Sequence, residues 1–430
     1  MHDDDDNIRP FRRQPGKPRK PTYSLLRRAL EANGFTNGIV AMNTFARRPV
    51  LKRQIPVPDQ PFDPDFRERP LRDSDITALA EVLEHEGFVP IRSSMVRDVV
   101  MLLADRNAYS PPAELIESLV WDGEPRLSTF FIDYAGVVPQ DDKHRAYVES
   151  VTRCFFISIV ARALQPGCKV DTMLILEGPQ GAQKSKLLRV VALRDEWFSD
   201  SLPHDLSTKD ARSHLPGNLV VEMAEVSQFK KSEIETVKAY LSCQHDKYRP
   251  SFGRFDIDWP RQNVFVGTTN ADNYLQDATG NRRFWPLRTT RIRPDEAALS
   301  IEQVYAEAYA AYDTGEQWWL PPDIEETARE EQADRMEEEP WYDEIADFIE
   351  TRDIDDGWQW TTVAAALSHL NIPKEARTRA QEMRVSAIFK RLGGERRQRT
   401  IHQPQGEMLD GAEKGKMQWQ YRFRPTSIQP

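Results

Sequence analysis

The feature that most constrains this fold is a short segment, residues 174–185, in which an apolar run passes through a glycine-bearing loop into Lys-Ser. The apolar run predicts a buried strand, and the residues from Lys184 onward predict a helix. A loop between them turns its backbone N–H groups, with those of the helix N-terminus, toward one point that suits a phosphate group. This strand, loop and helix form the context that a P-loop requires, so the segment predicts a nucleotide-binding α/β domain.

The parts of this loop have separate expected roles. Lys184 is expected to reach the β- and γ-phosphates, and the Ser185 hydroxyl is expected to ligate Mg²⁺, so the expected cofactors are ATP and Mg²⁺. The residues expected to contact the nucleotide form one continuous stretch: Gly178, Pro179, Gln180, Gly181, Ala182, Gln183, Lys184 and Ser185.

Gln183 stands where the P-loop pattern has its last glycine. If this position needs a positive φ, glutamine costs on the order of 1 kcal/mol or more. If φ is negative, a side chain is tolerated there. Two alternatives therefore stay open beside an active loop: a turn that binds nothing, and a degenerate loop that hydrolyses ATP weakly.

Polar side chains end two further predicted strands. Residues 218–223 form an apolar strand with Glu222 near its end and Glu225 just beyond, although burial of a carboxylate is costly. We assign Glu222 to Mg²⁺ and Glu225 to the attacking water, and the two roles can be exchanged. Asn270 follows the strand at 263–269, where an amide can contact the γ-phosphate or the water. Ligands of open α/β sheets gather at such strand ends.

Two basic segments accompany these strands. Arg282 and Arg283 are either surface ion-pair partners or, in a ring-shaped ATPase, groups that reach the nucleotide of a neighbouring subunit. Residues 246–258 predict a hairpin whose Lys247, Arg249 and Arg254 lie among aromatic residues, a composition that suits a loop following a DNA backbone. A purely structural hairpin is the competing interpretation.

The 430 residues are too many for one ordinary core and suggest about three domains. Strand-like and helical stretches alternate after residue 169, which predicts a parallel sheet. The net charge of −10 does not favour a nucleic-acid protein, but the charges are segregated along the chain. No apolar run predicts a transmembrane or signal segment, so we expect a cytoplasmic protein. The expected parts are a charged disordered tail (1–22), a helical N-terminal domain (23–145), an ATPase domain (146–322), an acidic helical linker (323–340) and a winged-helix-like domain (341–430).

An ordered series of motifs resembles the virulence-associated protein E family. Beside the loop it comprises WFSDSL at 197–202, VKAYLS at 237–242, YRP at 248–250, PRQ at 260–262, GTTN at 267–270 and GNRRFWP at 280–286. The resemblance covers most of residues 70–425 and is far more specific than any single motif. It implies an AAA+ ATPase core similar to superfamily 3 helicases, encoded by phages, prophages and genomic islands.

Carried over by position, the resemblance makes Lys184 and Ser185 the Walker A residues and Glu222 and Glu225 the Walker B residues. It also makes Asn270 the sensor 1 residue, and Arg282 and Arg283 the arginine-finger candidates. It further implies a homo-hexamer that moves single-stranded DNA through a central channel. We recognise no primase motif, so a separate primase or initiator is an expected partner.

The expected function is therefore an ATP-driven DNA helicase or origin-melting ATPase for replication of a phage or mobile element. The winged-helix-like domain is expected to dock on duplex DNA or on an initiator. Two other functions remain open: a nucleotide-gated DNA-binding initiator or regulator with little hydrolysis, and a phage-interference effector.

Overall fold

The protein was analysed as a computed structural model, which describes residues 18–57, 61, 63–228, 231–249, 256–275, 280–336, 340–400 and 417–425. The chain divides into two compact units, Met1–Met336 and Glu337–Pro430. Most of the predicted charged tail lies outside the described residues. Its last part is paired rather than free, since Arg19 exchanges backbone hydrogen bonds with Gly87 and Val89.

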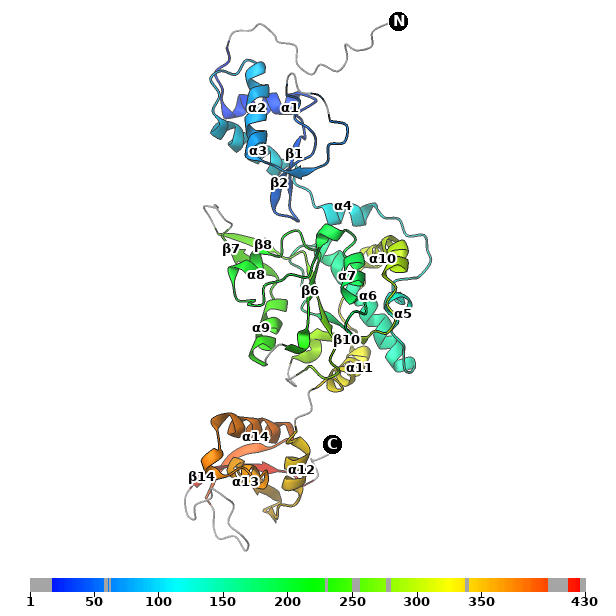
Figure 1. The fold of residues 1–430 in the computed structure, drawn as a ribbon, viewed down its shortest axis with the longest axis vertical. Coiled ribbons are helices and arrows are strands. Elements are labelled where there is room, and N and C mark those ends of the chain that lie inside the picture. Colours follow the sequence, from blue (N-terminus) through cyan, green and yellow to red (C-terminus); the bar gives the residue numbers. More distant parts are fainter. Residues whose placement is uncertain are drawn as a thin grey trace. The chain divides into compact units, whose positions relative to one another are not determined.

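The first unit begins with a small body that has its own hydrophobic core (Figure 1). Three helices pack there against a three-stranded antiparallel sheet in the order β1-β2-β3. Their bounds are α1 Tyr23–Ala32, β1 Val40–Asn43, β2 Arg48–Leu51, β3 Arg69–Pro70, α2 Asp73–His85 and α3 Ser93–Arg106. The predicted N-terminal domain was mainly helical and extended to residue 145. The structure adds the sheet, and the core of this body ends at Ala104.

The rest of the first unit is built around a five-stranded parallel sheet in the order β10-β4-β9-β6-β5. Helices α6, α7 and α10 contribute to the core on one face, and α8 and α9 to the core on the other (Figure 1). This confirms the predicted mixed α/β architecture with a parallel sheet. Its strands are β4 Met173–Glu177, β5 Phe198–Ser199, β6 Val220–Met223, β9 Val264–Thr269 and β10 Phe284–Arg288, whereas β7 His245–Tyr248 and β8 Ile257–Pro260 form a separate antiparallel pair.

The helices of this region include the one predicted to begin at Lys184. They are α4 Pro111–Ser118, α5 Phe130–Ala135, α6 Asp142–Leu164, α7 Lys184–Val191, α8 Lys209–Ser213, α9 Lys231–Leu241, α10 Pro294–Asp313 and α11 Pro322–Ala333. Short 3₁₀ turns lie at Asp195–Trp197, Val226–Gln228 and Asn281–Arg283. No helix of the described ranges has both the length and the apolar surface that crossing a membrane requires.

Residues 323–340 were predicted to form an acidic linker, but the first part of this segment is the packed helix α11. Helix α11 is not a solvated connector, because Ile324 and Ala328 belong to the main core. Gln332 is also buried, and its amide donates to the Phe284 carbonyl at 2.9 Å. Most acids of this helix are exposed, although Glu331 is buried and pairs with Arg335, and composition alone does not distinguish such an amphipathic helix from a linker.

Within its described residues, the second unit contains three helices and a four-stranded antiparallel sheet in the order β11-β12-β14-β13. Its elements are α12 Tyr342–Glu350, β11 Ile354–Asp355, β12 Trp358–Thr361, α13 Val363–His369, a 3₁₀ turn Lys374–Ala376, α14 Arg379–Arg391, β13 Glu395–Thr400 and β14 Met417–Phe423. All three helices share a core with Tyr421 and Phe423 of β14. Two short strands precede α13, and the unit closes with the antiparallel pair β13–β14.

Candidate nucleotide-binding site

The predicted phosphate loop connects the buried strand β4 to helix α7, at the carboxyl edge of the parallel sheet. Gly178 has to be small there. A Cβ at this position would lie 2.6 Å from the Thr289 hydroxyl, which follows the neighbouring strand β10. Gly181 has a φ of 79°, which glycine adopts without strain. The loop therefore has the shape and the location that a bound phosphate chain would need.

The structure shows that the φ angle of Gln183 is positive, which is the first of the two cases considered above. Its φ is 67° and its ψ is 25°, so the residue lies in the left-handed region at the N-cap of α7. Because this region brings Cβ close to the following carbonyl oxygen, a non-glycine residue there costs about 1–2 kcal/mol. Gln183 thus keeps the backbone geometry that glycine usually provides and carries the associated strain.

Lys184 points back across the mouth of the loop. Its ammonium donates to the carbonyl oxygens of Gly178 and Pro179, at 2.7 and 3.0 Å. Partial burial lowers the pKa of Lys184, whereas the nearby carboxylates of Glu225 and Glu222 act in the opposite direction. The ammonium is therefore held at the loop mouth, where a phosphate oxygen would find it.

The third element of the site is a buried cluster of oxygen atoms below the loop. The hydroxyls of Ser185 and Thr268 both donate to Oε1 of Glu222, at 3.0 and 2.6 Å. Glu222 is only 3% exposed. Its other oxygen, Oε2, is buried without a hydrogen-bond partner. Buried carboxylate oxygens normally have a partner, so this atom marks a place for a ligand.

This cluster fits Mg²⁺ by its chemistry. Mg²⁺ prefers oxygen ligands and commonly uses one or two protein groups together with substrate phosphates and water. Ser185 and Glu222 supply such a pair beside the loop. No group of three His, Cys, Asp or Glu residues within the described parts could hold a metal alone. The residues present therefore suit a metal that is bound together with a nucleotide.

The two remaining predicted polar groups lie near this cluster but make different contacts from those expected. Glu225 is half-buried with a φ of 53°, and its charge acts on Lys184. Asn270 is exposed just beyond β9, and Thr268, two residues earlier, contacts Glu222 instead. The assignment of Glu222 to the metal is consistent with these positions. The roles of Glu225 and Asn270 toward a water molecule stay predictions.

The structure does not bring Arg282 and Arg283 to the loop of the same chain. Both precede β10, which runs parallel to β4 with Phe284 beside Met173 and Arg288 beside Glu177. They consequently lie at the amino edge of the sheet, whereas the loop leaves its carboxyl edge. About five residues of strand, or roughly 16 Å, separate the two edges. Arg282 is exposed, and the Nε of Arg283 donates to the Ser242 hydroxyl at 3.1 Å.

The predicted hairpin is present as the antiparallel pair β7–β8, which joins α9 to β9. Lys247 and Arg249 are exposed, and Lys247 lies 3.7 Å from Asp258 on the opposite strand. Arg254 lies outside the described residues. A buried bidentate ion pair between Asp246 and Arg261 fixes the base of the hairpin.

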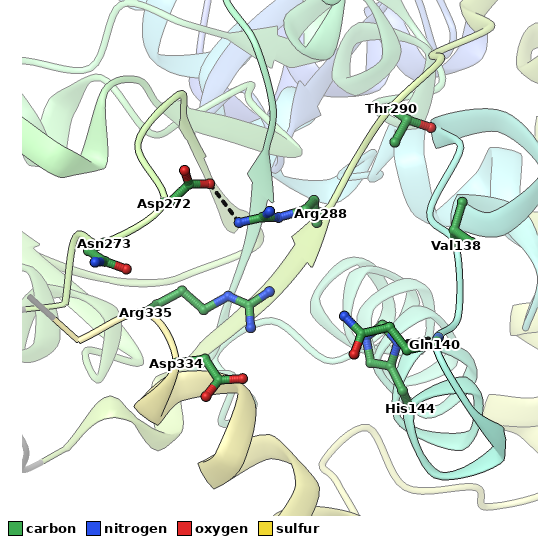
Figure 2. A pocket seen from close by; sticks show the side chains of 9 residues that line it. All are labelled: Val138, Gln140, His144, Asp272, Asn273, Arg288, Thr290, Asp334 and Arg335. Atoms are coloured by element: carbon green, nitrogen blue, oxygen red, sulfur yellow. Dashed lines mark hydrogen bonds and ion pairs between the residues drawn. The ribbon is translucent and has the colours of Figure 1, made fainter.

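A polar pocket of about 260 Å³ is lined by Arg288 at the carboxyl end of β10 and by Asp272, which follows β9 (Figure 2). Figure 2 shows Arg288 paired with Asp272 on one side and the Arg335 side chain extending toward the centre. Arg335 also holds the buried carboxylate of Glu177, the last residue before the loop, at 2.8 and 3.1 Å. The hydroxyl of Tyr274 donates to the same carboxylate at 2.9 Å. This network connects the loop to the end of α11 and to the segment that follows β9.

Sequence reasoning missed Thr268, Thr289, Tyr274 and Arg335 as parts of this region. Thr268 had a usable signal, because it belongs to the Thr-Thr-Asn ending of a predicted apolar strand. Arg335 had none, since it lies in an acidic segment 158 residues from its partner Glu177.

Comparisons with known proteins add a family and distant structural likenesses. A family model described as virulence-associated protein E-like domain matches residues 116–337, just over half of the chain. No curated protein matches. The A form apo structure of the NrS-1 C-terminal region has 13% identity and a TM-score of 0.49, covering 93% of this chain and 98% of that one. Another apo structure of that region has 14% identity and a TM-score of 0.45, covering 85% and 87%.

Proposed function

Because this chain belongs to the virulence-associated protein E-like family, we propose that it is a Mg²⁺-dependent ATPase that acts on DNA during replication of a phage or mobile genetic element. One observation carries the ATPase part of the proposal. The buried carboxylate of Glu222 receives the hydroxyls of Ser185 and Thr268 on one oxygen and leaves the other without a partner, directly below a phosphate loop. An ATPase needs such a carboxylate close to the loop serine.

The residues of the site divide the work as follows. Backbone N–H groups of the loop and of the first turn of α7 bind the phosphates, and Lys184 moves from its carbonyl partners to the β- and γ-phosphate oxygens. Ser185 and Glu222 hold Mg²⁺, which supplies charge neutralisation at the phosphoryl group when bound. Glu225 accepts a proton from the attacking water, and Asn270 orients that water.

The DNA part of the proposal rests on charge and topology. The exposed cations Lys247 and Arg249 extend from the hairpin at the amino edge of the sheet, where they would follow a single-stranded backbone. In the second unit, three helices followed by a β-ribbon have the order of a winged-helix domain, which would dock on duplex DNA or on an initiator. A homo-hexamer would place the hairpins around a channel.

Steady-state ATP hydrolysis tests the proposal, measured with and without single-stranded DNA. Wild type should hydrolyse ATP, DNA should stimulate it, and Lys184→Ala should abolish it because the phosphate contact is lost. Lys186→Ala is the matched control, since Lys186 lies on the same helix but pairs with the exposed Asp295. If wild type hydrolyses ATP no faster than Lys184→Ala, the ATPase proposal is wrong.

A second function is favoured by one observation, the strained left-handed backbone at Gln183. In this alternative the loop binds nucleotide and gates assembly on DNA, with little hydrolysis. It predicts that Gln183→Gly raises turnover from a background level, whereas in the motor the same change alters turnover only modestly. Sedimentation with and without ATP distinguishes a gated assembly from a protein that does not respond to nucleotide.

A further inference from the structure

The four-stranded sheet of the second unit has one face on the core and another away from it. Tyr421 and Phe423 of β14 share a core with all three helices of the unit. Successive side chains of a strand point to opposite faces, and directly opposite residues of antiparallel strands share a face. The register therefore assigns a second set of side chains to the other face, which we call the outer face: Trp358 and Trp360 of β12, Gln420 and Arg422 of β14, and Glu395 and Arg397 of β13.

Two tryptophans of β12 lie on the outer face rather than in the core. Trp358 and Trp360 are half-buried, and their Cα atoms are roughly 7 Å apart along the strand. The indole N–H of Trp360 donates to the Asp355 carbonyl at 3.2 Å, which fixes the orientation of that ring. Sheets that bind nucleic acids carry aromatic side chains in this way, and each ring stacks on one base.

Arginine side chains surround these rings. The guanidinium carbon of Arg422 lies 4.0 Å from the centre of a Trp358 ring, and that of Arg424 lies 5.4 Å from it. The carboxylate of Glu395 pairs with Arg422 at 2.6 Å and with Arg397 at 3.3 Å. The side chains of Arg397 and Glu395 are 58% and 45% exposed, and exposed ion pairs stabilise a protein little. A phosphate can therefore replace this carboxylate at low cost.

The charge of this region suits the backbone of a nucleic acid. Residues 390–400 hold five cations and one acid, although the whole chain has a net charge of −10. On the outer face the three arginines named above accompany two acids, Glu395 and Asp355 of the edge strand β11. Cations thus adjoin aromatic rings on one surface. A nucleic acid offers partners for both, because each of its nucleotides carries a planar base and an anionic phosphate.

The stacking surface determines which form of nucleic acid fits. In a duplex the faces of the bases are stacked on one another, so a side chain reaches them only where bases are unpaired and splayed out. A single strand leaves these faces free, and its backbone can follow the cations beside the rings. The outer face therefore favours a single strand over a duplex.

An amide of the outer face has no hydrogen-bond partner among the described residues. Gln420 is 2% exposed, and its Nε2 is buried without an acceptor, although buried donors normally have one. Its neighbours on the face are Arg397, directly opposite, and Arg422, two residues along β14. When these arginines turn toward phosphates, the amide can donate to the edge of a base.

We propose that the outer face of this sheet binds single-stranded DNA, with bases stacked on Trp358 and Trp360 and phosphates paired with Arg397 and Arg422. The inference deepens the DNA part of the proposed function, on which it rests, and it requires neither ATP nor the phosphate loop. The three helices on the opposite face stay available for duplex DNA or an initiator.

A matched pair of tryptophans tests the stacking. Trp360→Ala removes a ring of the outer face, whereas Trp419→Ala removes a ring from the opposite face of the same sheet. Trp419 is 54% exposed and also lies beside an arginine, since the guanidinium carbon of Arg396 is 4.6 Å from its ring. The affinity of the whole chain for a short fluorescent oligothymidine is measured by anisotropy without nucleotide.

Trp360→Ala should bind the oligothymidine about 5-fold or more weakly than wild type, because stacking on one base is lost. Trp360→Phe keeps a ring and should recover most of the affinity, and Trp419→Ala should bind like wild type. Equal affinities of Trp360→Ala and Trp419→Ala overturn the proposal.

A second matched pair tests the phosphate contact. Arg397→Gln and Arg396→Gln remove the same charge from adjacent positions of β13 that belong to opposite faces. Each phosphate contact of a single strand contributes about 0.7 to the slope of log affinity against log salt. Arg397→Gln should therefore reduce this slope by about 0.7, and Arg396→Gln should leave it unchanged. Equal slopes of the two variants overturn the proposal, because a diffuse field acts on both positions alike.

Two further readouts locate the single strand and separate this inference from the ATPase proposal. A bromodeoxyuridine oligonucleotide should photocrosslink to Trp358 or Trp360, as mapped by mass spectrometry, and crosslinks confined to residues 246–258 overturn the proposal. A duplex whose affinity depends on Trp360 as strongly also overturns it. If ATP turnover is absent while Trp360→Ala still binds the single strand weakly, the ATPase proposal fails and this inference stands. DNA-stimulated turnover together with normal binding by Trp360→Ala counts against this inference alone.

Discussion

Replacing Gln183 with glycine should stabilise the first unit, although glycine usually destabilises a protein. The residue has a φ of 67°, where a Cβ costs about 1–2 kcal/mol, and Gln183→Gly removes that cost. Glycine also loses more backbone entropy on folding, by about 0.5–1 kcal/mol. The expected net gain in the free energy of unfolding is therefore between about 0 and 1.5 kcal/mol.

Gln180→Gly is the matched control in the same loop. The φ angle of Gln180 is not positive. Glycine at this position therefore brings the entropy cost without relief of strain. It should destabilise by about 0.5–1 kcal/mol. The entropy terms cancel in the difference between the two variants, which should equal the strain of about 1–2 kcal/mol.

Urea denaturation followed by tryptophan fluorescence measures this difference, with Gln183→Ala as a third variant that keeps the strain. Gln183→Ala should have nearly wild-type stability, because its Cβ meets the same carbonyl oxygen. If Gln183→Gly is no more stable than Gln180→Gly, the left-handed position is not strained. The argument that this loop trades stability for its geometry would then be wrong.

Two further changes test other parts of the site, and a third tests the half-buried His214, whose ring contacts the Ser199 hydroxyl on β5. Glu222→Gln keeps an acceptor oxygen for both hydroxyls but removes the charge. Mg²⁺-dependent ATP turnover should therefore fall about 100-fold or more, while the affinity for nucleotide measured without Mg²⁺ should stay the same. Arg335→Met leaves the buried Glu177 carboxylate without its main partner, which should cost about 3–5 kcal/mol in urea denaturation, and Glu177→Gln in the same chain should restore part of it. Burial lowers the pKa of His214, so below about pH 6.5 the unfolded chain binds more protons than the folded chain. The free energy of unfolding should therefore fall as the pH drops below that value, and it should fall less in His214→Gln. Equal losses in wild type and His214→Gln would contradict this assignment.

The sequence predicted the elements whose signals are local. Strand β4 is a continuous apolar run, so the strand before the phosphate loop was predicted within a residue or two of its observed bounds. The three-stranded sheet of the N-terminal body was not predicted, because its strands have four, four and two residues. Such short segments show too little alternation to distinguish a strand from a loop.

In the candidate site too, residues marked by a local sequence signal were predicted, and contacts that depend on packing were not. Lys184, Ser185 and Glu222 could be found because a loop and the end of a strand mark them in the sequence. The contact of Thr268 with Glu222 depends on the parallel pairing of β9 with β6, which no local pattern contains. The pairing of Arg335 with Glu177 depends on how α11 packs, and the acidic composition around it predicted a solvated segment instead.

The topology of the sheet also explains why the candidate groups fall into two sets. The groups that we propose to bind phosphate lie at the carboxyl edge because the loop follows β4 there, while Arg282 and Arg283 precede β10 at the amino edge and Lys247 lies on the hairpin that leads into β9. Within one chain these sets cannot act on the same nucleotide. A second copy that presents its amino edge to the loop would bring them together, and would place a hairpin beside every nucleotide. Hydrolysis would then depend on contacts between neighbours, so a motor built from this chain should hydrolyse ATP only as an assembly, with turnover per subunit that rises with protein concentration.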